Sequence, residues 1–94
     1  VYAKIFKDQK AFSYCHIPSL SEVLDLVKAS DKKVGLQIEL KTDPNHPERS
    51  YSPAFLAQAL VKLLKNKDLI DQVEVQAFDF RCLQEIQRLE PKIR

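Results

Sequence analysis

The sequence predicts an α/β protein in which helix, strand, helix, strand and helix follow one another in a single domain. Residues 34–41 and 72–78 each alternate apolar and polar side chains, the pattern of strands with two different faces. Apolar residues recur at helical spacing before, between and after these strands. Because a long predicted helix separates the two strands, a crossover must join them and they should run parallel.

The first predicted helix begins after Ser19, which forms a capping box with Glu22 three residues later. We expect this helix to end near Ala29. Its apolar stripe comprises Leu20, Val23, Leu24 and Val27. The stripe predicts that one face of the helix packs against the sheet.

The second predicted helix begins after Ser52, with Pro53 at its first position, where a missing N–H costs nothing. Before it, the proline-containing residues 42–53 are predicted to form a long ordered loop. The third helix begins after Asp79 and ends before Pro91, and Ile93 is a candidate start of another strand. The expected apolar stripes are Phe55, Leu56, Ala59, Leu60, Leu63 and Leu64 in the second helix, and Leu83, Ile86 and Leu89 in the third.

Composition argues against several classes of function. The net charge is +2 and basic residues are not clustered, so binding to nucleic acid or to a membrane surface is not expected. No apolar stretch approaches the roughly 18 residues of a membrane span. Cys15 and Cys82 are too far apart to indicate a disulfide framework or a zinc site, and each is expected to be a small buried side chain. The chain lacks an initial Met, and we expect it to be a segment of a longer protein, cytoplasmic or periplasmic.

One face of each predicted strand is polar, whereas helices on both sides of a parallel sheet would require two apolar faces. These positions are Gln37, Glu39 and Lys41 on the first strand and Glu74, Gln76 and Phe78 on the second. A parallel sheet covered on one side is typical of the wall of a (β/α)8 TIM barrel, where catalytic groups lie at the C-terminal ends of the strands. Residues 1–94 are therefore predicted to form part of such a barrel, and self-association of the incomplete piece is expected.

The C-terminal ends of the predicted strands carry four candidate site residues. The Glu39 carboxylate suits a hard divalent cation, and the neighbouring Lys41 amine suits a phosphate or, as a nucleophile, a Schiff base. The two side chains could equally pair with each other and fill the barrel interior. Gln76 and Phe78 either contact substrate or pack.

Three motifs resemble those of the glycerophosphodiester phosphodiesterases. Residues 17–24, IPSLSEVL, resemble the family's "IPTLEEVL" helix start, and residues 37–41, QIELK, resemble its "IEIK" strand. Residues 75–79, VQAFD, resemble its "IQSFD" strand end. The order and spacing of these motifs agree over nearly all of residues 17–94, and the loop after the first strand is similar to that of a bacterial subgroup.

The resemblance implies a (β/α)8 barrel that hydrolyses glycerophosphodiesters to glycerol 3-phosphate and an alcohol with a divalent metal, Ca²⁺ or Mg²⁺. By position, it implies that Glu39 binds the metal, that Lys41 lies beside the phosphate, and that Gln76 and Phe78 line the substrate site. The family's His-Arg-Gly, Glu-x-Asp and His-Asp motifs have no counterpart here. Because the family's acid and base histidines belong to those motifs, we expect no catalytic residue in this segment and no activity from it alone.

His16 and His46 do not occupy the family's histidine motifs, and both are expected at the surface. Two other functions remain as alternatives. The first is a barrel enzyme of another class, in which Lys41 forms a Schiff base with a carbonyl substrate. The second is a small interaction module without chemistry.

Overall fold

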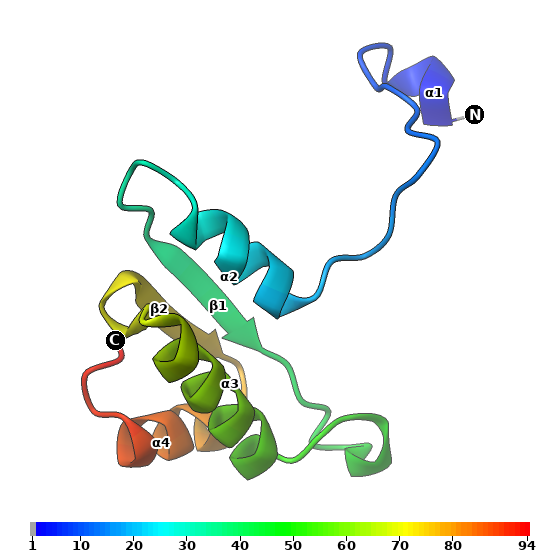
Figure 1. Cartoon of the computed structure of the whole chain (residues 1–94). Coiled ribbons are helices and arrows are strands. Elements are labelled where there is room, and N and C mark those ends of the chain that lie inside the picture. The colour runs from blue at the N-terminus through cyan, green and yellow to red at the C-terminus, as the bar shows by residue number, and fades with distance from the viewer. Residues whose placement is uncertain (1) are drawn as a thin grey trace.

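The computed structural model describes residues 2–94 as an extended N-terminal arm, residues 2–18, followed by an α/β body, residues 19–94 (Figure 1). The arm begins with the short helix α1 (Tyr2–Ile5) and continues through a turn at Lys7 and Asp8. In the view of Figure 1 it leads away from the rest of the molecule. The arm therefore contributes nothing to the core described below.

The body has the predicted order of helix, strand, helix, strand and helix. Its elements are α2 (Leu20–Lys28), β1 (Leu36–Leu40), α3 (Pro53–Lys67), β2 (Val73–Ala77) and α4 (Phe80–Leu89), with the 3-10 turns η1 (Pro47–Arg49) and η2 (Ile70–Gln72). Both strands are shorter than the predicted ranges 34–41 and 72–78, because the strands pair only over five residues each. None of the helices in the described chain has the length and apolar character that crossing a membrane requires.

The two strands form one parallel sheet, as predicted from the long crossover between them. Pairing runs from Leu36 opposite Val73 to Leu40 opposite Ala77. Helix α3 provides the crossover (Figure 1). The fold class, α/β with a parallel sheet, is therefore confirmed.

The three helices α2, α3 and α4 start at the residues that the sequence predicted. The Ser19 backbone N–H donates to Glu22 Oε2 at 2.7 Å, and the Glu22 backbone N–H donates to Ser19 Oγ at 3.3 Å, which completes the capping box of α2. Ser52 Oγ accepts a hydrogen bond of 3.2 Å from the Phe55 backbone N–H, with Pro53 in the first turn of α3. These caps satisfy N–H groups that have no partner within the helix.

The core lies between the helices and one face of the sheet. Its most completely buried side chains are Leu24, Leu64, Leu69, Val73 and Cys82. Burial of Cys82 agrees with the prediction, but Cys15 is exposed. Cys15 belongs to the arm, which holds it away from the body, so the expectation that both thiols are buried is wrong.

The buried face of α3 differs from the predicted stripe. It is formed by Ala57, Leu60, Val61 and Leu64, which follow helical spacing. Phe55 and Ala59, which were expected inside, are exposed. Instead of entering the core, the Phe55 ring stacks on Tyr51, with ring centroids 4.6 Å apart. Leu60 and Leu64 are buried as predicted, and Leu56 and Leu63 pack against the core, whereas the buried Ala57 and Val61 were not part of the predicted stripe.

Candidate functional site

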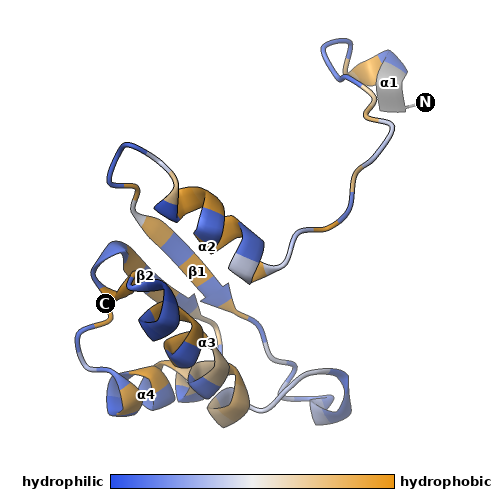
Figure 2. Ribbon diagram, viewed as in Figure 1, coloured by the Kyte–Doolittle hydropathy of each residue, from blue (hydrophilic) through white to orange (hydrophobic). Residues whose placement is uncertain are grey.

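The sheet has one face toward the core and one face exposed, and the exposed one is called the open face here. Figure 2 shows the alternation as bands of apolar and polar residues along β1. The paired register places Gln37 opposite Glu74 and Glu39 opposite Gln76. Because successive residues of a strand point to opposite sides, all four side chains belong to the open face. The polar positions of both strands are thus brought together as predicted.

Glu39 and Lys41 form an ion pair at the C-terminal end of the open face. Lys41 Nζ lies 3.5 Å from Glu39 Oε2. The lysine side chain is 78% exposed, whereas the glutamate is 25% exposed. Because water screens such a pair, it adds little to stability. The amine can turn toward an incoming anion at small cost, while the carboxylate keeps its place on the strand.

Two adjoining hollows lie at this end of the sheet. One, of about 210 Å³, is lined by Glu39, Leu40, Lys41, Thr42, Phe78 and Asp79. The other, of about 160 Å³, is lined by Glu39, Gln76, Ala77 and Phe78. The hollows share Glu39 and Phe78, so the four predicted site residues meet at one place. Chemically this place offers a carboxylate, an amine, an amide and an aromatic surface.

A polar cluster beside these hollows was not predicted. Thr42 Oγ1 donates a hydrogen bond of 2.7 Å to Asp79 Oδ2. The Arg81 guanidinium donates two more, from Nε to Asp79 Oδ1 at 2.9 Å and from Nη2 to Oδ2 at 2.8 Å. The Arg81 bonds, followed by the Thr42 bond, hold the pKa of Asp79 well below its ordinary value. The Asp79 carboxylate is therefore ionised at neutral pH.

The sequence contained a signal for this cluster. Asp79 was interpreted only as the cap of α4, which it is, because its Oδ1 also accepts the Arg81 backbone N–H at 3.1 Å. Continuing the parallel register by two residues beyond each strand would have placed Thr42 opposite Asp79.

The metal ligand expected at Glu39 can be compared with the acidic groups around it. Glu39 offers a carboxylate on the open face, while Asp79 is occupied by Arg81 and Thr42. Within residues 2–94, no three His, Cys, Asp or Glu side chains are grouped so that they could hold a metal ion. Calcium takes about six to eight oxygen ligands and magnesium about six. Glu39 alone therefore supplies fewer oxygen ligands than either ion takes.

Both histidines are exposed, as expected. His16 Nε2 lies 3.1 Å from Glu22 Oε1, at the start of α2. His46 Nδ1 lies 3.5 Å from Glu48 Oε1, in the loop after β1. Each histidine is paired with a glutamate near it in sequence, and neither lines the hollows of the open face.

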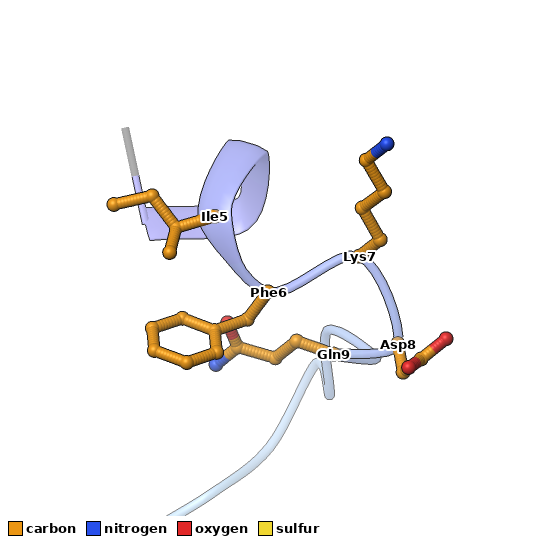
Figure 3. Close-up of a pocket in the computed structure, with 5 residues that line it drawn as sticks. All are labelled: Ile5, Phe6, Lys7, Asp8 and Gln9. Atoms are coloured by element: carbon orange, nitrogen blue, oxygen red, sulfur yellow. The ribbon is translucent and has the colours of Figure 1, made fainter.

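A further hollow, of about 630 Å³, lies in the N-terminal arm and is lined by residues 5–9 (Figure 3). Its five side chains spread around a single turn of the chain (Figure 3). Lys7 and Asp8 are the charged residues among them. Because one short segment supplies the whole lining, this hollow brings no distant groups together and is not treated as a site.

No family model, curated protein or solved structure matches the chain.

Proposed function

We propose that this chain is part of the wall of a (β/α)8 barrel in a metal-dependent glycerophosphodiester phosphodiesterase. In this proposal Glu39 binds the divalent metal, Ca²⁺ or Mg²⁺, and Lys41 contacts the phosphate. Gln76 and Phe78 line the substrate site. The observation that carries the proposal is that all four side chains gather at the C-terminal end of a parallel sheet, on its open face.

The arrangement of the layers supports a barrel wall. The helices pack on the core face of the sheet, and the opposite face carries polar side chains at matching positions of both strands. In a barrel that polar face points inward, and the strand ends form the mouth where substrate binds. The sheet described here has two strands, so the remaining walls must come from other residues.

The motifs that resemble the phosphodiesterase family coincide with the start of a helix and the ends of both strands. The helix-start motif carries the capping box of α2. The other two motifs end β1 and β2, where Glu39 lies opposite Gln76. The resemblance and the geometry thus support the same four residues for metal and substrate binding.

The division of labour among these groups follows from their charges. A divalent metal ion, when bound, offsets negative charge on phosphoryl oxygens. Glu39 would supply one of its oxygen ligands, and the Lys41 ammonium would attract the phosphate from the adjacent position on the strand. Phe78, which is 94% exposed, offers an apolar surface for the glycerol carbons. Proton transfer is left to residues outside this set, so the chain should bind the product without hydrolysing the diester.

The test is an NMR titration of the whole chain with Ca²⁺ and then glycerol 3-phosphate. The amide signals of Glu39, Lys41 and Phe78 should shift, and Glu39→Gln should remove the metal-dependent part. Glu74→Gln is the matched control, because Glu74 is a carboxylate on the same open face at the other end of the sheet. A response that survives in Glu39→Gln would overturn the proposal. Choline release from glycerophosphocholine by the chain alone would contradict only the expectation that its acid and base groups lie outside this set.

Lys41 as a Schiff-base nucleophile is the competing enzymatic function, and its exposed amine favours it. Borohydride with a carbonyl substrate should then trap an adduct on Lys41 and not in Lys41→Arg. Under the phosphodiesterase proposal no such adduct forms at Lys41 beyond the level seen at the exposed Lys10, which serves as an internal control.

A further inference from the structure

The hydrogen bond between Thr42 and Asp79 continues the register of the sheet. The last paired residues are Leu40 and Ala77, and every pair in the sheet has the sequence offset of the Thr42–Asp79 pair, 37 residues. Thr42 and Asp79 are each two positions further along. Their side chains are therefore hydrogen-bonded beyond the end of the backbone pairing, at the position where the next pair of residues facing the same side of the sheet would lie.

Strand alternation assigns the neighbouring residues to opposite faces. Thr42 and Asp79 follow Leu40 and Ala77 by two, so they belong to the core side. Burial agrees, because the Asp79 side chain is 8% exposed. Lys41 and Phe78 lie between the last backbone pair and the Thr42–Asp79 hydrogen bond, and both line the hollow of about 210 Å³.

Asp79 also connects this end of the sheet to α4. The Arg81 guanidinium donates hydrogen bonds to both carboxylate oxygens of Asp79, and the same carboxylate caps the helix. Charge-assisted, two-pronged bonds of this kind are stronger and more strictly oriented than neutral ones. The Thr42–Asp79–Arg81 cluster, called the clasp below, thus fixes the end of β1 to the first turn of α4.

We infer that Asp79 is a positioning residue, which acts through the clasp to hold Lys41 opposite Phe78 at the candidate substrate site. That Lys41 and Phe78 contact a phosphate ester is taken from the proposed function, and the inference rests on it. The position of Glu39 does not depend on the clasp, because Glu39 lies within the paired part of β1. Loosening the clasp should therefore disturb phosphate binding more than metal binding.

The buried thiol of Cys82 reports on the clasp. Cys82 lies in the first turn of α4, next to Arg81, and is fully buried. Burial raises the pKa of this thiol, and the negative charge of Asp79 raises it further. Opening the clasp should expose the thiol to reagents. Cys15, exposed in the arm, reacts in the same sample and provides the internal standard.

The test compares Thr42→Val, which removes the hydroxyl but keeps the shape, with Thr42→Ser, which keeps the hydroxyl. With an aromatic disulfide reagent, Thr42→Val should label Cys82 about tenfold faster, as expected for loss of a hydrogen bond to a charged group, while Cys15 is unaffected. Glycerol 3-phosphate should bind Thr42→Val several-fold more weakly, with Ca²⁺ binding unchanged. Thr42→Ser should restore both values.

Faster Cys82 labelling with unchanged phosphate affinity would overturn the inference, because the clasp would then be structural only. If the unmodified chain binds no glycerol 3-phosphate, the proposed function fails. The positioning role of the clasp is then tested separately, by measuring the backbone order of Lys41 and Phe78 with ¹⁵N relaxation. Order that falls in Thr42→Val and returns in Thr42→Ser supports positioning, and equal order in both refutes it. Should Thr42→Val not fold, Arg81→Lys, which breaks the two-pronged grip but keeps the charge, replaces it.

Discussion

The Val75 backbone N–H donates a hydrogen bond of 2.7 Å to the carbonyl oxygen of Arg94. This bond places the chain that follows α4 beside the outer edge of β2. Ile93, one residue earlier, is 4% exposed and belongs to the core. The residues after Pro91 therefore lie where a third strand next to β2 would begin, which is the place that the sequence suggested for Ile93.

Ile93→Ala should lower the free energy of unfolding by about 2–5 kcal/mol, because it leaves a cavity among buried side chains. Urea unfolding followed by circular dichroism measures the change. Ile17→Ala is the matched control, since Ile17 is 94% exposed in the arm and its loss should matter by less than about 0.5 kcal/mol. Equal effects at the two isoleucines would contradict the burial of Ile93.

Ser52→Ala should destabilise the chain by about 1 kcal/mol, because the Phe55 backbone N–H at the start of α3 loses its acceptor. The same urea experiment measures it. Ser13→Ala, in the exposed part of the arm, should leave the unfolding midpoint in place. If both serine variants behave alike, the cap of α3 contributes nothing.

Stability should depend on pH through Asp79. Its pKa is lowered in the folded chain from an ordinary value of 3.8, mainly by Arg81 and then by Thr42. As the pH falls below about 4, the unfolded chain therefore takes up a proton before the folded chain does, and the free energy of unfolding decreases. The contribution is fully present above about pH 5 and is lost toward the lower folded pKa. When the pH is lowered from above about 5 to below about 4, the urea midpoint should fall more in the unmodified chain than in Asp79→Asn.

A parallel loss in Asp79→Asn would assign the pH dependence to other carboxyl groups. Glu22 and Glu90 also have lowered pKa values, caused first by the Ser19 backbone N–H and by the Lys65 side chain, respectively. Both groups are present in Asp79→Asn, so their effect cancels in the comparison.

The chain's one glycine and its one described left-handed non-glycine residue suggest a pair of stabilising changes. Asp68, after α3, has φ 55°, a conformation that glycine adopts without strain. Gly35 lacks such a φ, and an added Cβ there would meet no atom within 4 Å. Asp68→Gly and Gly35→Ala should each raise the unfolding free energy by up to about 1 kcal/mol. A lower thermal midpoint in either variant would contradict the backbone conformation described for that residue.

If the chain is a piece of a barrel, the purified chain should self-associate. The open face of its two-stranded sheet carries polar groups, while Phe78, after β2, and Phe80, at the start of α4, are 94% and 72% exposed. Sedimentation should show species larger than a monomer, and the thermal midpoint should rise with protein concentration. A monomeric, cooperative and concentration-independent melt would instead favour the small interaction module.

Local rules account for what the sequence predicted well. Caps at Ser19, Ser52 and Asp79 depend on neighbours within three residues, so they could be recognised without tertiary information. The proximity of Glu39 and Gln76 could be predicted once the strands were known to be parallel, and the length of the connection between the strands indicates that they are.

Features set by tertiary packing were not predictable in the same way. Helical spacing allowed Phe55 and Ala59 to be inside, but the folded chain buries Ala57 and Val61 instead. The exposure of Cys15 depends on the path of the arm, which no periodic pattern encodes. The clasp joins the segment after β1 to the first turn of α4, and only the parallel register, continued beyond both strands, relates Thr42 to Asp79.

The register between β1 and β2 also constrains the order of folding. Each pair joins residues 37 positions apart, so the sheet contains no local contact from which it could start. Closing such a loop costs entropy before any pair forms, whereas α3, which lies within the loop, is built from neighbours in sequence. We expect the helix to form within microseconds and to shorten the loop, and strand pairing to set the overall folding rate.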